Sequence, residues 1–408
     1  MKKTNSQNKR IVGLDMHPDV FAAAAIEKTD PVLTSVLWTQ DRLETTKLEA
    51  WARKNLHSDD IVVLEASGNS FEIAHRLRGE GFTTLVLESC QAGKLRENYC
   101  NDDRHSAIKL ARVYLSGLAK IVWQPDEQTR QRREVFFSHR NAVRDTTRHR
   151  NRIRSFLNEY CVRLPAGTPL TKEQGLKKAL SLRNWNPLQE ELIKEAFQQL
   201  WYSEARRKRL EQIMVAELVR EPKWARLWRL MGIRHRVAFA LMAMIGDIHR
   251  FPTAKKLVGY LGLSPRKVQS GNNAKGKELG IGKTGRGDVR CLLVQSAQNA
   301  LVQRGSPLHK WGWKLLMRKS RNTAAAAVAR KLATAVWYLL KGFFTPLLEM
   351  NDHLETKLTK LATVLGKERL RAEGYQDRKS FVQAVFKSLQ LVAEGGLCPP
   401  KPPGDLSL

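Results

Sequence analysis

Three acidic residues are placed where a metal-dependent phosphodiester chemistry can be built. Asp15 ends the apolar run Ile-Val-Gly-Leu, and Glu65 ends the similar run Ile-Val-Val-Leu. A carboxylate at the end of a buried strand is costly unless it meets a cation, and two parallel neighbouring strands would bring both acids to one sheet edge. Asp103 opens a predicted helix, 103–115, that can pack across that edge. Oxygen ligands suit Mg²⁺ or Mn²⁺, although either strand-end acid alone is more simply a solvated residue.

A second group with chemical potential is the glycine-rich segment 264–290. Its six glycines let the backbone approach a phosphate closely, and the basic residues between them neutralise its charge. A serine hydroxyl in this segment is a candidate nucleophile toward phosphorus. Composition alone favours the simpler alternative, a loop that only binds phosphate. The basic residues expected to contact nucleic acid here are Arg266, Lys267, Lys283, Arg286 and Arg290.

The charge of the chain indicates a polyanionic partner. The 408 residues include 70 Lys and Arg against 40 Asp and Glu, a net charge of +30. Such an excess favours nucleic acid, because basic side chains release counterions from phosphates. No secretory signal and no apolar run long enough to cross a membrane is found, and the five cysteines show no zinc-ligand spacing. We therefore expect a cytoplasmic protein with reduced thiols and no membrane partner.

The first 128 residues have an α/β pattern. The predicted strands are 11–16, 20–28, 32–39, 61–66 and 83–87, and the predicted helices are 45–55, 70–79 and 103–115. Turn residues join the first three strands into an antiparallel meander, and strand-helix-strand units follow. This order of elements is that of the RNase H fold. We expect domain 1–128 to have this fold.

Residues 129–221 are expected to form a coiled-coil arm of two long helices. The first helix, 130–163, has an apolar seam at Phe136, Val143, Ile153 and Leu157. The second starts at Asn186-Pro187, an N-cap followed by proline at the first helical position. The segment 164–185 between them contains two prolines and is predicted to be a hinge or hairpin tip. The arginines of the first helix expected to bind nucleic acid are Arg130, Arg132, Arg133, Arg140, Arg144, Arg148, Arg150, Arg152 and Arg154.

The remainder of the chain has helical patterns. Residues 222–345 are compactly helical with short glycine breaks, which predicts an all-α domain that carries the serine-containing loop. Residues 346–408 form a C-terminal extension. Its last part, 395–408, is rich in glycine and proline and is predicted to be a disordered tail. The fold class is therefore α/β plus all-α.

The sequence segments around these residues, taken in their order along the chain, resemble the DEDD transposases of the insertion-sequence 110 family (1111 subgroup). These transposases are viewed as bridge-RNA-guided DNA recombinases. The resemblance covers nearly the full length. It is carried by the segments 13–17, 64–66, 103–112, 245–251, 260–265, 270–271, 283–285, Arg290 and 327–332.

The resemblance implies a RuvC-like first domain with metal ligands at Asp15, Glu65 and Asp103, and a helical domain with a nucleophilic serine. Ser270 matches that serine, and Ser264 is the less favoured alternative. The fourth acid of the family is replaced by Ser106, whose hydroxyl is a poorer Mg²⁺ ligand than a carboxylate. Either Asp102 or a water held by Ser106 takes that place, or metal binding is weakened.

The resemblance also implies partners and a reaction. A structured guide RNA would bind the arm, base pairing would select donor and target double-stranded DNA, and Ser270 would form a 5′-phosphoserine link. Strand exchange needs several active sites, so a tetramer built as a dimer of dimers in the bacterial cytoplasm is implied. Two alternatives stay open: a metal-dependent nuclease or Holliday-junction resolvase, and a non-catalytic RNA- or DNA-binding scaffold.

Overall fold

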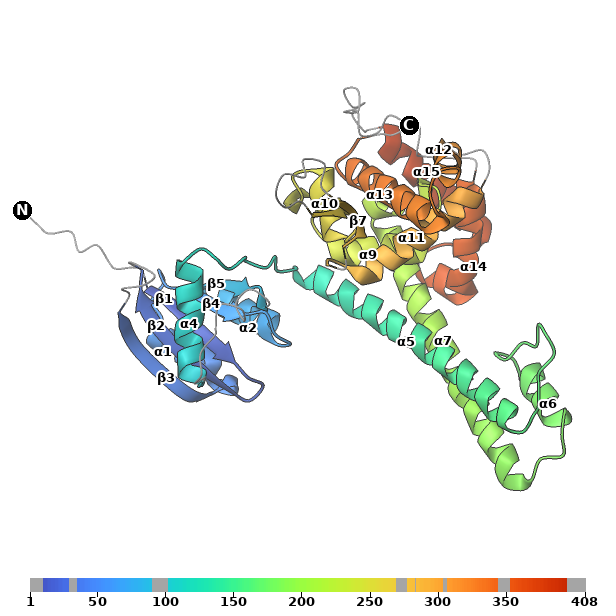
Figure 1. Ribbon diagram of the computed structural model, residues 1–408, viewed down its shortest axis with the longest axis horizontal. Helices are drawn as coiled ribbons and strands as arrows, with labels where there is room; N and C mark the ends of the chain where they lie inside the picture. Colours follow the sequence, from blue (N-terminus) through green and yellow to red (C-terminus); the bar gives the residue numbers. More distant parts are fainter. Residues whose placement is uncertain are drawn as a thin grey trace, which may run out of the picture. The chain divides into compact units, whose positions relative to one another are not determined.

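The computed structural model describes residues 10–28, 35–89, 102–268, 277–282, 284–303, 307–343 and 353–394. The chain divides into two compact units, residues 1–125 and 126–408. The first is a mixed α/β unit and the second is almost entirely helical (Figure 1). The boundary lies three residues before the predicted end of the first domain. The predicted segments 129–221, 222–345 and 346–408 all contribute to the second unit.

A five-stranded sheet organises the first unit. Its strands are β1 (Arg10–Met16), β2 (Val20–Glu27), β3 (Val36–Glu44), β4 (Ile61–Glu65) and β5 (Thr83–Leu87). Their order is β3-β2-β1-β4-β5. The first three strands pair antiparallel, whereas β4 pairs parallel with both β1 and β5. The predicted meander and the predicted parallel pairing of the two acid-bearing strands are confirmed.

Helices cover both faces of this sheet. Val12 and Leu14 pack on one face with residues of α1 (Leu48–Asn55), which follows the short 3-10 helix η1 (Thr45–Lys47), and of α2 (Ser70–Gly79). Ile11 and Val63 pack on the other face with α4 (Asp103–Leu115). Burial on both faces explains why β1 and β4 are continuous apolar runs and do not alternate with polar residues.

The predicted third strand has the wrong limits. The sequence pattern placed it at 32–39, but β3 continues to Glu44 and begins at Val36, with 32–34 outside the described residues. Its second half, Thr-Gln-Asp-Arg-Leu-Glu, lies at the sheet edge, where polar side chains meet solvent and obscure the strand pattern. Arg42, with φ of 53°, adds a local irregularity to this edge.

The arm consists of α5 (Glu127–Glu159) and α7 (Pro187–Arg220), which lie side by side (Figure 1). Asn186 caps α7, as predicted, and the structure adds a capping box with Gln189 and a cap of α5 by Asp126. Phe136, Ile153 and Leu157 are buried in the seam, whereas Val143 is only half-buried. Apart from Ala142, the other buried positions of α5 are polar: Thr129, Arg132, His139 and Thr146.

The segment between the two arm helices, predicted to be a hinge or hairpin tip, is the tip of the helical hairpin and is itself folded. It contains helix α6 (Glu173–Ser181), and its side chains close a small hydrophobic core at the end of the arm (Figure 1). Leu170 and Trp185 are buried there, and the Trp185 indole donates to the carbonyl of Ala179 at 3.2 Å. The prolines and glycines that suggested a hinge mark the turns between these packed pieces.

The rest of the second unit packs around α9 (His235–Ile245), in which every residue from Val237 to Ile245 is buried. Neighbouring elements are α8 (Pro222–Ala225), η2 (Arg226–Arg229), η3 (Ile248–Arg250), α10 (Ala254–Tyr260), β6 (Pro265–Val268), β7 (Lys277–Ile281), α11 (Gly287–Val302), α12 (Pro307–Leu316) and α13 (Arg321–Leu340). Among the described helices none is long and apolar enough to cross a membrane. Cys161 and Cys291 are free thiols.

The C-terminal extension is folded onto this core. It forms α14 (Leu354–Ala372) and α15 (Arg378–Glu394), whose apolar residues belong to the same hydrophobic cluster as α9. The Lys357 ammonium donates to the carbonyls of Trp228 and Leu230 at 2.6 and 2.8 Å, and burial lowers its pKa to about 8. The predicted disordered tail, 395–408, lies outside the described residues.

A buried ionic network joins the arm to the core. One carboxylate oxygen of Glu211 on α7 accepts from His139 of α5 at 3.1 Å, from Arg207 at 2.6 Å and from Arg236 of α9 at 2.5 Å. Burial alone would raise the pKa of Glu211, but the His139 hydrogen bond and the two arginine charges outweigh it and lower the pKa to about 2. Burial lowers the pKa of the nearby His235 imidazole to about 4.

This network makes the stability of the second unit depend on pH. Between about pH 6.5 and pH 4 the His235 imidazole is protonated in the unfolded chain but neutral in the folded chain. Between about pH 4.5 and pH 2 the Glu211 carboxyl group is likewise protonated in the unfolded chain but ionised in the folded chain. We therefore expect the free energy of unfolding, measured in urea, to fall steadily from pH 6.5 to 4. In His235→Leu the fall should begin only near pH 4.5. A curve for this variant identical to that of the unaltered chain would contradict this account.

Candidate active site

The three predicted acids lie on one side of the sheet. Along β1 the side chains of Ile11 and Asp15 share a face with Gly13, and along β4 Glu65 shares a face with Val63. Ile11 and Val63 pack against α4. Leu14 pairs with Leu64 in register, so Asp15 and Glu65 follow at the same level on neighbouring strands. Asp103 is the first residue of α4, which covers this face.

Two of these acids meet a histidine. Asp15, His17 and Asp103 each offer one ligand atom, and the three atoms lie within 4.8 Å of one another. The Nε2 atom of His17 is 3.5 Å from Oδ1 of Asp103, and about half of each of these two side chains is exposed. Among the described residues no other group of this kind occurs, and Glu65 does not belong to it. The structure thus brings together two of the three predicted ligands and adds one.

His17 was not predicted as a ligand. It stands two residues after Asp15, in the turn that joins β1 to β2, and this short spacing is its one signal in the sequence. The turn is held on both sides, since the His17 carbonyl accepts from the Thr45 hydroxyl at 3.4 Å and from the Asn69 amide at 3.3 Å. The imidazole is therefore presented from a fixed backbone.

A groove of about 530 Å³ lies beside this turn. It runs between the β1–β2 turn and the start of α2, where Ser70 accepts from the backbone N–H of Ser67 at 3.0 Å and orders the loop after β4. The groove lies on the α2 side of the sheet, and its lining does not include Asp15, His17, Glu65 or Asp103. Its lining residues are Met16, Pro18, Thr45, Ser67, Gly68, Asn69, Glu72, Ile73 and Arg76.

Two contacts fix the start of α4 and so the position of Asp103. Arg104 pairs with Asp41 of β3 at 2.7 Å, and a hydrogen bond from the arginine lowers the pKa of that carboxyl group. Asp102 is the N-cap: its carboxylate accepts from the backbone and the ring of His105, both at 2.7 Å, and these bonds lower its pKa. Asp102 is thus engaged as a cap, and it lies outside the group formed by Asp15, His17 and Asp103.

Ser106, which the resemblance places at the position of a fourth acid, lies one turn after Asp103. Its residue is buried, with 9% of its surface exposed, whereas Asp103 is exposed. A carboxylate at this position would be desolvated beside the sheet and would require a cation. Whether Ser106 contributes to metal binding stays a prediction.

Gly13 allows α4 to lie directly against β1. A methyl group at this position would overlap with the carbonyl oxygen of Ala107 and come within 3.2 Å of the backbone nitrogen of Ala111. Because both obstacles are backbone atoms, the helix itself would have to move. We expect Gly13→Ala to weaken Mn²⁺ binding at least about 10-fold, measured by isothermal titration, and to destabilise the first unit by about 2 kcal/mol. Gly79→Ala, with open space around its α-carbon, is the control and should change neither.

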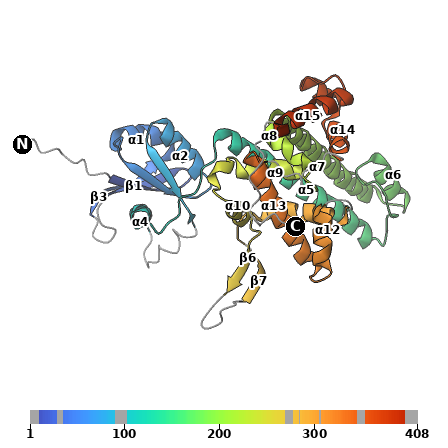
Figure 2. The same ribbon diagram turned by 90° about the horizontal axis from the view of Figure 1, so that it is seen from above.

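The predicted serine loop belongs to a β-hairpin. Strands β6 and β7 pair antiparallel with Val268 opposite Lys277, and Figure 2 shows the hairpin extending from the helical core. Ser270 and Lys283, like the side chain of Lys267, lie outside the described residues. Ser264 is half-buried at the base of the hairpin, where its carbonyl accepts from Gly282. Arg266 is exposed.

Two predicted phosphate ligands are engaged in holding the hairpin and its surroundings. Arg290 donates to the carbonyls of Gly262, Gly282 and Thr284 at 3.4, 3.0 and 3.3 Å. Arg286 pairs with Asp288 at 2.7 Å. Arg290 thereby ties together the two ends of the hairpin.

The nine predicted arginines of the arm divide into two groups. Arg132 is buried and pairs with Glu217 and Glu221, while Arg133 donates to the carbonyls of Ala243 and Met244 at the end of α9. Arg130, Arg140 and Arg150 are half-buried and each pairs with an acid. The exposed arginines, available for a polyanion, are Arg144, Arg148, Arg152 and Arg154.

The donor set at the sheet edge fits a divalent cation. Two carboxylates supply the oxygen ligands that Mg²⁺ and Mn²⁺ prefer, and their mutual repulsion would be relieved by the ion. An imidazole is an unusual Mg²⁺ ligand but is accepted by Mn²⁺ and other transition metals. The residues that would hold the ion are Asp15, Asp103 and His17, with Glu65 on the adjacent strand.

Comparison with known families assigns both units. A model of the IS110 DEDD transposase domain, described as "Transposase", matches residues 12–162, which include all three predicted acids. A second model, "Transposase IS116/IS110/IS902 family", matches residues 225–311, which include the hairpin. The chain is an IS110-family transposase. This insertion-sequence transposase is therefore a DNA-acting protein that carries a DEDD domain.

Individual relatives of the transposase agree with this assignment. The "Transposase for insertion sequence element IS1111A" of Coxiella burnetii is 24% identical over 343 residues, 83% of this chain and 92% of that protein. The "Probable family 20 transposase" of Pseudomonas aeruginosa is 26% identical over 340 residues, 81% and 96% of the two chains. The "Pilin gene-inverting protein" of Moraxella lacunata is 30% identical over 111 residues, 27% and 34% of the two chains.

Proposed function

We propose that this transposase catalyses RNA-guided, site-specific DNA strand exchange, with a RuvC-like site of Asp15, Glu65 and Asp103 and with Ser270 as nucleophile. The observation that carries the proposal is the convergence of Asp15, His17 and Asp103 at the edge of a sheet ordered β3-β2-β1-β4-β5. Closely spaced carboxylates can hold the divalent ions that assist a phosphodiester reaction.

In the proposed reaction the Ser270 hydroxyl oxygen attacks a DNA phosphorus atom. A P–O bond forms to the serine as the bond to the 3′ oxygen breaks, and the serine proton passes to that leaving oxygen. The product is a 5′-phosphoserine link and a free 3′-hydroxyl, and the reverse reaction with another strand completes exchange. Divalent ions at the carboxylate site would stabilise charge on the phosphate oxygens. His17, as a further ligand, would orient that site.

Guide RNA is assigned to the arm in this proposal. The exposed arginines Arg144, Arg152 and Arg154 form no ion pair with a carboxylate in the part of the chain that the structure describes. Contacts between arginines and phosphates carry no sequence information, so base pairing by an RNA would have to supply the sequence choice. Cleavage of two DNA partners requires several active sites, which supports a dimer of dimers acting in the bacterial cytoplasm.

The proposal is tested by the nucleic acid that copurifies with the transposase. Expressed with its flanking DNA, the chain should retain one discrete structured RNA, identified by sequencing. Substitution of Arg144, Arg152 and Arg154 by glutamine should reduce the yield of this RNA about 10-fold or more. In the control variant, Arg53, Lys54 and Arg78 of the first unit are substituted by glutamine. Recovery of only random fragments, or equal loss in both triple variants, would reject the RNA-guided mechanism.

A further inference from the structure

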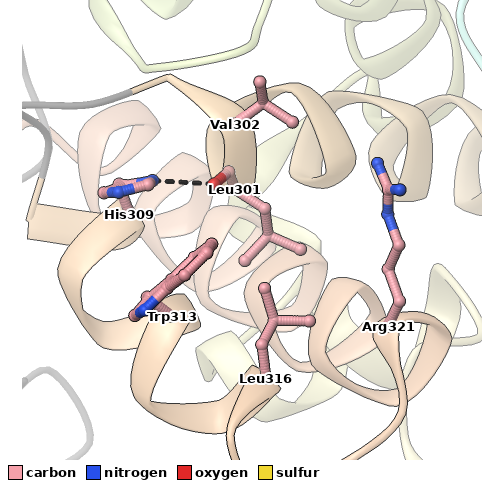
Figure 3. Close-up of a pocket in the computed structure, with 6 residues that line it drawn as sticks. All are labelled: Leu301, Val302, His309, Trp313, Leu316 and Arg321. Carbon is pink, nitrogen blue, oxygen red and sulfur yellow. Dashed lines mark hydrogen bonds between the residues drawn. The ribbon is translucent and has the colours of Figure 1, made fainter.

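A pocket between α11, α12 and α13 is lined by none of the residues predicted to act in catalysis. It measures about 570 Å³, and Figure 3 shows Arg321 across it from His309 and Trp313, with Leu301 and Leu316 between them. Val302 completes the lining. The pocket therefore combines an aromatic wall, an apolar base and one cation.

The aromatic wall is open to solvent. Trp313 is 55% exposed and Val302 is 67% exposed, although both belong to well-formed helices. The Trp313 ring is backed by His309 at 5.9 Å between ring centres, and His309 is fixed by a 2.7 Å hydrogen bond to the Leu301 carbonyl. The neighbouring ring is thus fixed in place, while the Trp313 ring stays accessible. A planar group could stack there.

The helix carrying Trp313 is held tightly at its centre. Gly312 packs α12 against its neighbours, because an added methyl group there would overlap with the Leu301 side chain and approach Val328 at 3.2 Å. Trp313, the next residue, is exposed and lines the pocket together with Leu301. The aromatic ring is therefore displayed by a rigid helix, which lowers the entropy lost when a ligand binds.

The stretch of sequence that carries the pocket is strongly cationic. From residue 289 to residue 348 the sequence contains ten Lys and Arg and no Asp or Glu. Within the described part of the chain, the five cations nearest to Trp313 in sequence are exposed and none pairs with a carboxylate. A ligand that places phosphates over this surface would neutralise charges that the protein leaves uncompensated. These cations are Lys310, Lys314, Arg318, Lys319 and Arg321.

We propose that this pocket binds an unpaired nucleobase of a DNA strand, stacked on Trp313, with the flanking phosphates on the basic residues around it. A single nucleotide fits a pocket of this volume, and stacking plus phosphate contacts is the usual way in which proteins hold unpaired strands. DNA is the occupant because the family acts on DNA. The inference rests on the proposed function only in that strand exchange exposes unpaired DNA.

The proposal is tested by binding of a fluorescent 12-nucleotide DNA strand and of the same sequence as a duplex. Measurements use the full chain with Ser270→Ala and with EDTA, so that no covalent step or metal is involved. Trp313→Ala should weaken single-strand binding about 10-fold and duplex binding less than 2-fold, and Trp313→Phe should stay within about 3-fold of the parent. Met317→Ala, which removes another exposed apolar side chain just after α12, should change neither.

Covalent mapping supplies the second measurement. A strand carrying 5-iododeoxyuridine should crosslink on irradiation to the peptide containing Trp313. Equal losses for single strand and duplex, a crosslink elsewhere, or tighter binding of the matching RNA strand would overturn the proposal. Competition by polyglutamate as strong as by the DNA strand would instead indicate an acidic polypeptide. Because these assays need no catalysis, a chain inactive in strand exchange still gives a decisive result.

Discussion

Asp15→Asn is expected to lower strand exchange by about 10³-fold or more while the chain stays folded. Asparagine keeps the size of the side chain but removes its negative charge. That charge binds the cation, and in the absence of a cation it repels Asp103. Mn²⁺ affinity should fall at least about 100-fold, because a ligand is lost outright. Exchange is measured by quantitative PCR of donor–target junctions, and metal affinity by isothermal titration.

The control for this variant is Asp59→Asn. Asp59 is exposed in the turn before β4, so it lies at the opposite end of that strand from Glu65. The Asp59→Asn substitution should leave strand exchange and Mn²⁺ affinity unchanged. If Asp15→Asn bound Mn²⁺ as tightly as the unaltered chain, the carboxylate site would not be a metal site. His17→Ala should give an intermediate loss of Mn²⁺ affinity if its imidazole is a ligand.

Ser270→Ala is expected to abolish strand exchange, with a loss on the order of 10⁶-fold that reaches the detection limit. The hydroxyl oxygen is the attacking atom in the proposed reaction, and alanine has none. Mn²⁺ affinity should be unchanged, because Ser270 lies in a different unit of the chain from Asp15 and Asp103. Loss of exchange with full metal binding is the pattern that separates a nucleophile from a metal ligand.

Ser264→Ala is the matched control for the nucleophile. Ser264 is the other serine of the hairpin region and is half-buried at its base, where the backbone rather than the hydroxyl makes the observed contact. We expect this variant to retain at least about a third of the exchange activity. Full strand-exchange activity in Ser270→Ala would contradict the assignment of Ser270 as the nucleophile. Complete loss of this activity in Ser264→Ala, with an unchanged melting temperature, would indicate Ser264 instead.

The sheet and its acids were predictable because local patterns specify them. Continuous apolar runs ending in Asp15 and Glu65 require strands buried on both faces, and such strands pair parallel under covering helices. His17 was not predictable, since a histidine in a turn carries no periodic signal and its meeting with Asp103 depends on a contact 86 positions away along the chain.

In the arm, the sequence predicts the helices but not which of their arginines are exposed. Its two helices and their caps follow from sequence, but composition cannot separate Arg132, which is buried against Glu217 and Glu221, from Arg144, which is exposed. That difference depends on how the two helices are rotated about their axes, and the polar seam at His139 and Thr146 gives no apolar stripe to fix it. The small hydrophobic core around Trp185 was not predicted, because the prolines in this segment indicated only a hinge or hairpin tip.

Denaturing electrophoresis of a reaction containing the transposase, copurified RNA, and donor and target DNA tests the central claim most directly. We predict a DNA–protein adduct that protease treatment removes, that requires Asp15, and whose nucleotide remnant is located on Ser270 by peptide mass spectrometry. DNA nicked without an adduct would instead show a metal-dependent nuclease. Intact DNA in every lane, with the discrete RNA bound, would contradict catalysis and leave a nucleic-acid-binding scaffold.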